Sequence, residues 1–318
     1  MSAYANLERR LARREVILLD GAIGTRLQSM GVPMSGLAWA AAALESHPFT
    51  VRRMHEEYVA AGVDIITTNT YSSARHNLEP LGLGDKVVEL NLRAVMLAQD
   101  ARDRTAGDRP PLIAGSVSNF GLRVACEGDY EERRSETSEA QARANLRQQA
   151  DILAEAGVDF LIAESTGGNI HRKWVVEACL ATGLPVWPGF KVRQDERESM
   201  PRLGYSSPET IADGFDEVMA LGGDVVCLFH SLISATDAAL DVVRARWHGP
   251  ICVYPEAERM DYVDTYRDRG RPTPVTPEEF TAWARHCVEA GVQVVGGCCG
   301  IEIEHIRPLR DALPTHLP

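Results

Sequence analysis

The sequence predicts an α/β protein in which residues 1–318 form one (β/α)8 TIM barrel domain. Three observations support this prediction. Eight short apolar runs rich in β-branched residues recur along the chain, segments of helical period separate them, and several of these segments end in glycine just before the next run. Apolar strands that alternate with amphipathic helices are typical of a parallel sheet covered by helices. Eight such units favour a closed barrel, with an open doubly wound sheet as the alternative.

The predicted strands and helices alternate from one end of the chain to the other. The strands are Val16–Asp20, Asp64–Tyr71, Pro111–Ser118, Asp159–Ser165, Pro185–Val192, Asp224–Ser231, Pro250–Glu256 and Val292–Gly300. The clearest helices are Thr50–Ala61, Lys86–Arg102, Ala140–Ala156 and Pro277–Ala290. Gly62, Gly157 and Gly291 each follow an alanine and precede a strand, where the end of a helix favours left-handed backbone.

Composition excludes several classes of function. The formal charge of −12 and the isoelectric point near 5.3 argue against a nucleic-acid partner, which requires a basic surface. No apolar stretch approaches the roughly 20 residues of a membrane span, and Met1–Glu15 lacks the apolar core of a secretory signal. We therefore expect a cytoplasmic protein. Its 7 cysteines are an odd number without a dense framework, which favours free thiols or metal ligands over disulfides.

In a barrel of this type the chemistry lies at the C-terminal ends of the strands. Polar residues mark most of these predicted ends: Asp20, Asn69 to Tyr71, Ser116 to Asn119, Glu164 to Thr166, Cys227 to Ser231, Glu256, and Cys298 with Cys299. The longest predicted connections are Leu122–Glu139, Arg193–Ser207 and Ala257–Thr276. They are interpreted either as surface loops or as lids over the site.

The most specific pattern is the run Gly-Gly-Cys-Cys-Gly at 296–300. Neighbouring residues of a regular strand point to opposite faces, but flanking glycines allow both thiols of Cys298 and Cys299 to turn toward one point. Cys227, at the end of the sixth predicted strand, offers a third thiolate. Three thiolates around Zn²⁺ leave one position open, as in catalytic zinc sites. A reactive vicinal pair and two buried free cysteines are the alternatives, and Cys252, inside a strand, is a weaker candidate.

Several motifs resemble the homocysteine S-methyltransferase family, over nearly the whole chain. They are Asp-Gly-Ala-Ile-Gly-Thr at 20–25, Thr-Asn-Thr-Tyr at 68–71, Asp-Phe-Leu-Ile-Ala-Glu at 159–164 and the cysteine run at 296–300. The resemblance implies a zinc-dependent barrel in which Cys227, Cys298 and Cys299 hold Zn²⁺. It further implies that a small sulfonium or betaine donor methylates the thiol of homocysteine to give methionine, since a thiolate is the nucleophilic form of a thiol.

The same resemblance assigns residues to the substrates. Asp20 and Glu164 would face the ammonium group of homocysteine, with Glu164 also counted as catalytic, and backbone amides at Gly24 and Thr25 would receive its carboxylate. A turn or helix cap remains the alternative for Asp20, and a salt bridge with an arginine remains the alternative for Glu164.

Two aromatic residues and one amide complete the predicted site. Trp39 and Tyr71 are candidates for holding a cationic donor against an aromatic face, and Asn69 is a further substrate-binding candidate. Ordinary packing is the alternative for Trp39. The expected partners are small molecules, and we expect a monomer or a small homo-oligomer.

Departures from the family pattern gather at the predicted catalytic end. Val226 replaces the usual asparagine before the first zinc cysteine, and Glu256 stands where an asparagine is common. His230 is interpreted as a satisfied strand-end histidine, with a zinc neighbour and a base as alternatives. The same chemistry on a different thiol or donor is therefore a second hypothesis. A non-catalytic barrel that binds metal or senses redox state is a third.

Overall fold

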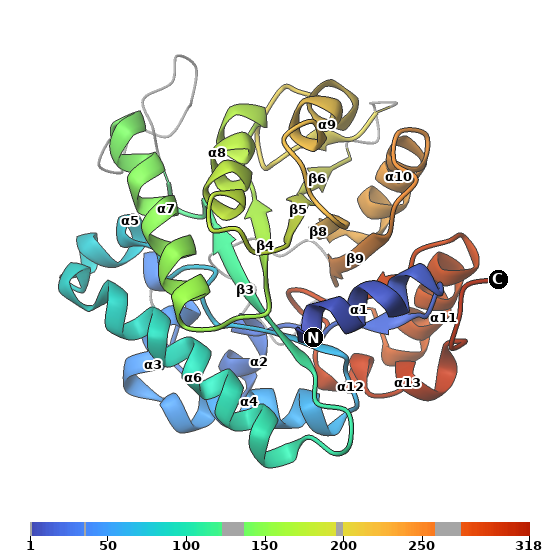
Figure 1. Ribbon diagram of the computed structural model, residues 1–318, viewed down its shortest axis with the longest axis horizontal. Coiled ribbons are helices and arrows are strands. Elements are labelled where there is room, and N and C mark those ends of the chain that lie inside the picture. Colours follow the sequence, from blue (N-terminus) through green and yellow to red (C-terminus); the bar gives the residue numbers. More distant parts are fainter. Residues whose placement is uncertain (1, 35, 123–136, 195–199, 258–274) are drawn as a thin grey trace.

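The computed structural model describes residues 2–34, 36–122, 137–194, 200–257 and 275–318, and it shows strands surrounded by a ring of helices (Figure 1). Eight parallel strands form one sheet in the order β1-β10-β9-β8-β5-β4-β3-β2. These strands are β1 Ile17–Leu18, β2 Ile65–Thr67, β3 Leu112–Ser118, β4 Phe160–Ser165, β5 Val186–Phe190, β8 Val226–Leu232, β9 Ile251–Glu256 and β10 Val294–Val295.

Backbone hydrogen bonds between β1 and β2 close this sheet into a barrel. Asp64 N donates to Leu18 O at 2.8 Å and Asp20 N donates to Ile65 O at 3.0 Å. A parallel bridge pairs Leu19 with Ile65 between them. The first and last strands of the sheet therefore meet, and the predicted (β/α)8 barrel is confirmed.

The helices lie outside the barrel, and the long ones agree with the predicted segments to within a few residues. The helices are α1 Ala3–Ala12, α2 Gly24–Ser29, α3 Ala43–Ser46, α4 Pro48–Ala60, α5 Arg75–Leu78, α6 Val87–Thr105, α7 Glu139–Glu155, α8 Asn169–Leu180, α9 Ile211–Met219, α10 Ile233–Arg244, α11 Pro277–Glu289, α12 Ile303–Ile306 and α13 Leu309–Ala312. Short 3-10 turns lie at Gly36–Ala38, Ala40–Ala42, Glu79–Leu81 and Gly84–Lys86. Gly62, Gly157 and Gly291 have φ of +82°, +88° and +91°, as the predicted helix ends require.

Two layers of buried side chains hold the barrel together. One layer packs between the strands and the helices, and the other fills the interior of the barrel. Tyr4, Leu7 and Leu11 of α1 belong to the interior layer, and Trp187 Nε1 donates to Tyr4 Oη at 2.9 Å. Since Trp187 lies at the start of β5, α1 covers the N-terminal end of the barrel. The opposite end is left to form a site.

The boundaries of three predicted strands differ clearly from the structure. The predicted run Asp64–Tyr71 is a strand only at β2, which ends at Thr67. The predicted run Pro185–Val192 divides at Lys191 into β5 and a short strand β6 Val192–Arg193, which pairs in antiparallel fashion with β7 Arg202–Leu203. The predicted run Val292–Gly300 is a strand only at β10, because the glycines that follow leave β geometry.

Residues 123–136, 195–199 and 258–274, which form parts of the predicted long connections, lie outside the described residues. The prediction that these connections act as lids falls on those residues and stays a prediction. Among the helices that the structure describes, none combines the length and apolar character needed to cross a membrane.

Candidate active site and metal centre

A pocket lies at the C-terminal ends of the barrel strands. It brings together most of the predicted site residues, namely Asp20, Gly24, Trp39, Asn69, Tyr71, Glu164, Cys298 and Cys299. Residues that the sequence did not single out for substrate binding also line it, among them Ser116, Phe120, His230 and Tyr254. Thr25 and Cys227 are not part of its wall.

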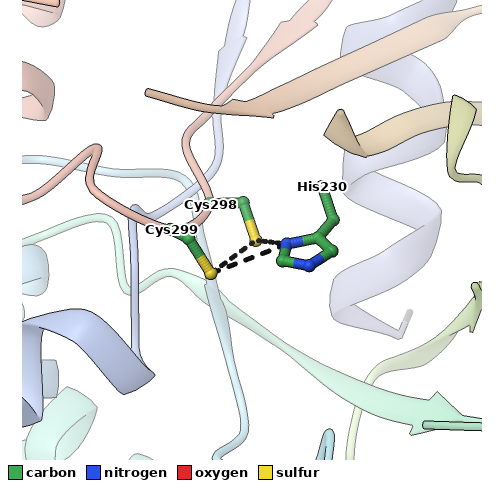
Figure 2. A group of neighbouring side chains, drawn as sticks. All are labelled: His230, Cys298 and Cys299. Atoms are coloured by element: carbon green, nitrogen blue, oxygen red, sulfur yellow. Dashed lines mark hydrogen bonds between the residues drawn. The ribbon is translucent and has the colours of Figure 1, made fainter. Parts of the chain in front are cut away.

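His230, Cys298 and Cys299 form a group that could hold a metal ion. Figure 2 shows the three side chains converging on one point, with His230 Nδ1 3.3 Å from Cys298 Sγ and 3.6 Å from Cys299 Sγ. The two sulfurs are 4.0 Å apart. Tetrahedral zinc, at its usual bond lengths to sulfur and nitrogen, separates its ligand atoms by about 3.6 to 3.8 Å. The group therefore has the donor atoms and spacing of such a centre.

The glycine-rich backbone explains why both cysteines face the same way. The chain leaves the sheet after β10, and Gly300 has φ of +77°. A Cβ atom on Gly297 would lie 2.2 Å from Ile301 Cγ2, so a side chain has no room there. Cys298 N donates to Pro255 O at 2.8 Å and Ala257 N donates to Cys299 O at 2.8 Å. The backbone leaves strand geometry as the flanking glycines predicted, and these two hydrogen bonds anchor the turn to the end of β9.

His230 reaches the site through an irregularity in β8. The pairing of β8 with β9 shifts register between Phe229 and Leu232, and His230 has φ of +46°, uncommon for a residue other than glycine. Regular alternation would have turned His230 outward, like Val226 and Leu228. The bulge instead directs the imidazole into the pocket, and Lys191 Nζ stabilises this backbone by donating to His230 O at 2.7 Å.

The structure does not bring Cys227, the third predicted ligand, into the group formed by His230, Cys298 and Cys299. Cys227 is fully buried in the interior layer of the barrel and pairs in register with Cys252 of β9. Phe229, the next residue of β8 on the same face, lies between Cys227 and the C-terminal end of the strand. The physical reason is depth, because Cys227 lies three residues before the strand reaches the level of the site.

The sequence itself indicates where the sixth strand reaches the C-terminal end of the barrel. The apolar run of the sixth strand continues past Cys227 and ends only at His230 and Ser231. The first polar residue after the run, and not the first cysteine in it, therefore indicates the end of the strand. Among the interpretations of His230, its place beside Cys298 and Cys299 favours the zinc neighbour over the satisfied strand-end histidine.

Two buried carboxylates lie in the same pocket. Asp20 accepts hydrogen bonds from Thr67 N at 2.7 Å and Thr67 Oγ1 at 3.0 Å. Glu164 accepts from Ser116 Oγ and, at 3.0 Å, from Tyr254 Oη. Burial raises the pKa of Asp20 to about 8, and it also raises the pKa of Glu164. Neither carboxylate has an arginine or lysine partner among the described ion pairs, so both are suited to a cationic ligand.

Aromatic side chains line the pocket near the metal group. The rings of Tyr71 and Phe120 are 5.2 Å apart, and Tyr71 lies 6.2 Å from the His230 ring. Trp39, with φ of +41°, lies close enough to Gly24 that a Cβ there would be 2.1 Å from Trp39 Nε1. Trp39 and Phe120 also line the pocket, and with Tyr71 they form an aromatic wall; Tyr254, a further aromatic residue of the pocket, has its hydroxyl hydrogen-bonded to Glu164.

Two of the remaining predicted residues, Asn69 and Thr25, form hydrogen bonds with backbone atoms around the site. Asn69 Nδ2 donates to Ala40 O at 2.9 Å, which ties the segment after β2 to the Trp39 loop. Gly24 lines the pocket at the start of α2. Thr25 Oγ1 accepts a hydrogen bond from Gly300 N at 3.0 Å, and thus links α2 to the cysteine turn.

Comparison with known proteins agrees with this geometry. A family profile described as homocysteine S-methyltransferase matches residues 17–313, which include the whole barrel and the cysteine turn. The chain belongs to this family. It is therefore an S-methyltransferase, which sets aside the hypothesis of a barrel without catalysis.

Relatives whose names specify different substrates or substrate pairs resemble this chain to a similar degree. A selenocysteine methyltransferase of Astragalus bisulcatus is 27% identical, over 94% of this chain and 92% of its own. A homocysteine S-methyltransferase of Escherichia coli is 28% identical, over 94% and 96%. A betaine–homocysteine S-methyltransferase of Danio rerio is 26% identical, over 96% of this chain and 74% of its own. Identity alone therefore does not choose a substrate.

Solved structures agree on the fold. The metallated form of the homocysteine methyltransferase MmuM from Escherichia coli superposes with a TM-score of 0.73 at 24% identity, covering 96% of this chain and 99% of that one.

Proposed function

We propose that this methyltransferase transfers a methyl group from a small cationic donor to the thiol of homocysteine, giving methionine, at a zinc ion held by His230, Cys298 and Cys299. One observation carries the proposal. A donor group with the spacing of a metal centre and two buried carboxylates line one pocket. A substrate thiol would bind at the metal centre and a substrate ammonium group would bind to the carboxylates. Homocysteine has both groups.

The ligand set in this proposal contains one imidazole and two thiolates. Zinc at these three side chains would leave a fourth position open and, when bound, would make a substrate thiol a thiolate at neutral pH. A neutral imidazole in place of a third thiolate reduces the negative charge that the protein supplies by one. Cys227, the third ligand implied by the resemblance, is replaced by His230 in this proposal because its thiol lies among the buried residues of the barrel.

Asp20 and Glu164 would bind the amino group of the acceptor. Thr67 holds the Asp20 carboxylate through two hydrogen bonds, while Ser116 and Tyr254 hold that of Glu164. These fixed partners orient the carboxylates before the acceptor arrives, which lowers the ordering cost of binding. An incoming ammonium would lower the raised pKa of each carboxyl group and so favour the ionised forms.

The aromatic wall would hold the methyl donor. Sulfonium and quaternary ammonium groups bind to the faces of aromatic rings and need no hydrogen-bond acceptor. Trp39, Tyr71 and Phe120 offer such faces in the same pocket as the sulfurs. Methyl transfer from a cation to a thiolate neutralises charge, so the residues of this chain would act by positioning both partners and excluding water.

Metal analysis tests the proposal. Protein purified without chelator should contain about one zinc per chain, and adding homocysteine should bring another sulfur into the metal coordination shell, as seen by X-ray absorption. S-Methylmethionine and a betaine are then compared as donors by methionine formation. If zinc is present but its coordination does not change on adding homocysteine, the acceptor is another thiol. Full activity in metal-free protein would refute the metal centre.

A further inference from the structure

The second nitrogen of the His230 imidazole has a partner outside the pocket wall. His230 Nε2 lies 2.5 Å from the hydroxyl of Tyr205, while Nδ1 faces the two sulfurs and lies 3.4 Å from Glu256 Oε2. The Tyr205 ring meets the imidazole edge-on, with 5.9 Å between the ring centres. The tyrosine therefore contacts the side of the imidazole that is turned away from the metal group.

Tyr205 is itself held in place by the backbone and by a lysine. Its N–H donates to Thr166 O at 3.3 Å, and the preceding Gly204 donates to Lys191 O at 2.9 Å. Gly204 has φ of +63°, and a Cβ there would lie 2.4 Å from Thr166 O. The Lys191 ammonium lies 4.4 Å from the centre of the Tyr205 ring, a cation–π distance.

Lys191 contacts both members of the pair. Its side chain is buried, its ammonium donates to His230 O at 2.7 Å, and it faces the Tyr205 ring. The backbone of His230 and the ring of its hydroxyl partner are thus fixed by one cation. This arrangement orients the imidazole from two directions, through its carbonyl and through Nε2.

We infer that Tyr205 is a positioning residue that selects Nδ1 of His230 as the metal-binding nitrogen. A metal-binding imidazole donates its other N–H to an oxygen, and that bond sets both the tautomer and the ring orientation. With the proton on Nε2 and donated to Tyr205 Oη, the lone pair of Nδ1 points toward Cys298 and Cys299. The inference rests on the proposed metal centre and adds the residue that orients its histidine.

Zinc affinity of the Tyr205→Phe variant, measured by competition with a chromophoric chelator, tests the inference. Loss of the oxygen partner should weaken zinc binding about 10- to 100-fold. In cobalt-loaded protein, the visible ligand-field bands should shift, because the imidazole is no longer held in one orientation. Tyr4→Phe is the matched control, since it removes a hydroxyl that contacts Trp187 at the other end of the barrel, and its zinc affinity should equal that of the wild type.

A double-mutant cycle separates positioning from general support of the fold. In a His230→Cys background there is no imidazole to orient, so Tyr205→Phe should leave zinc affinity unchanged. An equal loss in both backgrounds, or no loss in either, would overturn the role of Tyr205 while leaving the metal centre intact. A wild-type chain that binds no zinc would overturn the metal centre, and the role of Tyr205 with it.

Discussion

Among the residues that the structure describes, two pairs of cysteines are neighbours in this barrel, and one of these pairs is placed to bind a metal. Cys298 and Cys299 are half-buried at the C-terminal end, beside an imidazole. Cys227 and Cys252 are fully buried neighbours on β8 and β9, inside the barrel. The chemical groups are the same, so position alone separates the two pairs.

The difference shows what a thiol needs in order to become a ligand. Burial raises the pKa of Cys227 well above its ordinary value, and the contact with Cys299 together with burial raises that of Cys298 as well, so the pKa of the thiol does not separate the pairs. Geometry does: regular strand geometry gives Cys227 no third donor, while the glycine turn and the bulge of β8 bring three donors together at the C-terminal end of the barrel. Thiols in strand interiors thus serve packing, and thiols on irregular backbone at strand ends serve chemistry.

The largest expected effect separates the two pairs directly. Cys298→Ala should lose zinc and reduce methyl transfer by about 1000-fold or more, because two remaining donors do not hold the ion. Cys227→Ala should keep both, and should lower the free energy of unfolding by about 1 to 2 kcal/mol through a small cavity. Elemental analysis, activity and urea unfolding check both variants. Loss of zinc in Cys227→Ala would end the distinction between the pairs.

Substitutions of His230 would sharpen the comparison. His230→Ala should weaken zinc binding by about 100-fold or more, since it leaves only two thiolates, whereas His230→Cys should retain the metal with three. Chelator competition gives the affinities. If zinc binds His230→Ala as tightly as the wild type, the histidine is not a ligand.

Glu164 interacts electrostatically with both cysteine pairs. Its negative charge contributes to the raised pKa of Cys227, and a charge on Cys299 contributes to the raised pKa of Glu164 itself. Glu164→Gln should weaken acceptor binding about 10- to 100-fold by removing a charged partner of the ammonium group. Zinc content should not change. Calorimetry with homocysteine and metal analysis of the same sample test this, and an unchanged affinity would remove Glu164 from the acceptor site.

The smallest expected effect is a pH dependence that arises from Asp20. With its pKa raised to about 8, this carboxyl group is mostly protonated at neutral pH in the empty pocket and must release its proton to pair with an ammonium. Binding of methionine, which has no thiol to ionise, should therefore strengthen as pH rises toward 8, by up to about tenfold per pH unit. Asp20→Asn should flatten the slope. An identical slope in this variant would assign it to another group.

Much of this protein follows from local sequence. The alternation of apolar strands and amphipathic helices predicted the barrel, because each pattern has only one way to bury its apolar face. Glycines at helix ends and around Cys298 and Cys299 predicted where the backbone turns, because left-handed φ and close contacts favour glycine. Strand periodicity predicted that Asp20 and Glu164 lie at strand ends, and the family resemblance implied their role toward an ammonium group; both line the pocket.

Only the tertiary structure decided which thiols and which imidazole share a site. Strand periodicity places Cys227 and His230 on opposite faces, but it shows neither where a strand ends nor where a bulge reverses the alternation. The register shift in β8 depends on its pairing with β9, and the backbone of His230 depends on Lys191, 39 residues away in the chain. Such long-range contacts leave no local pattern, so the sequence determined the barrel and its cysteine turn, while the packed strands decided the composition of the metal group.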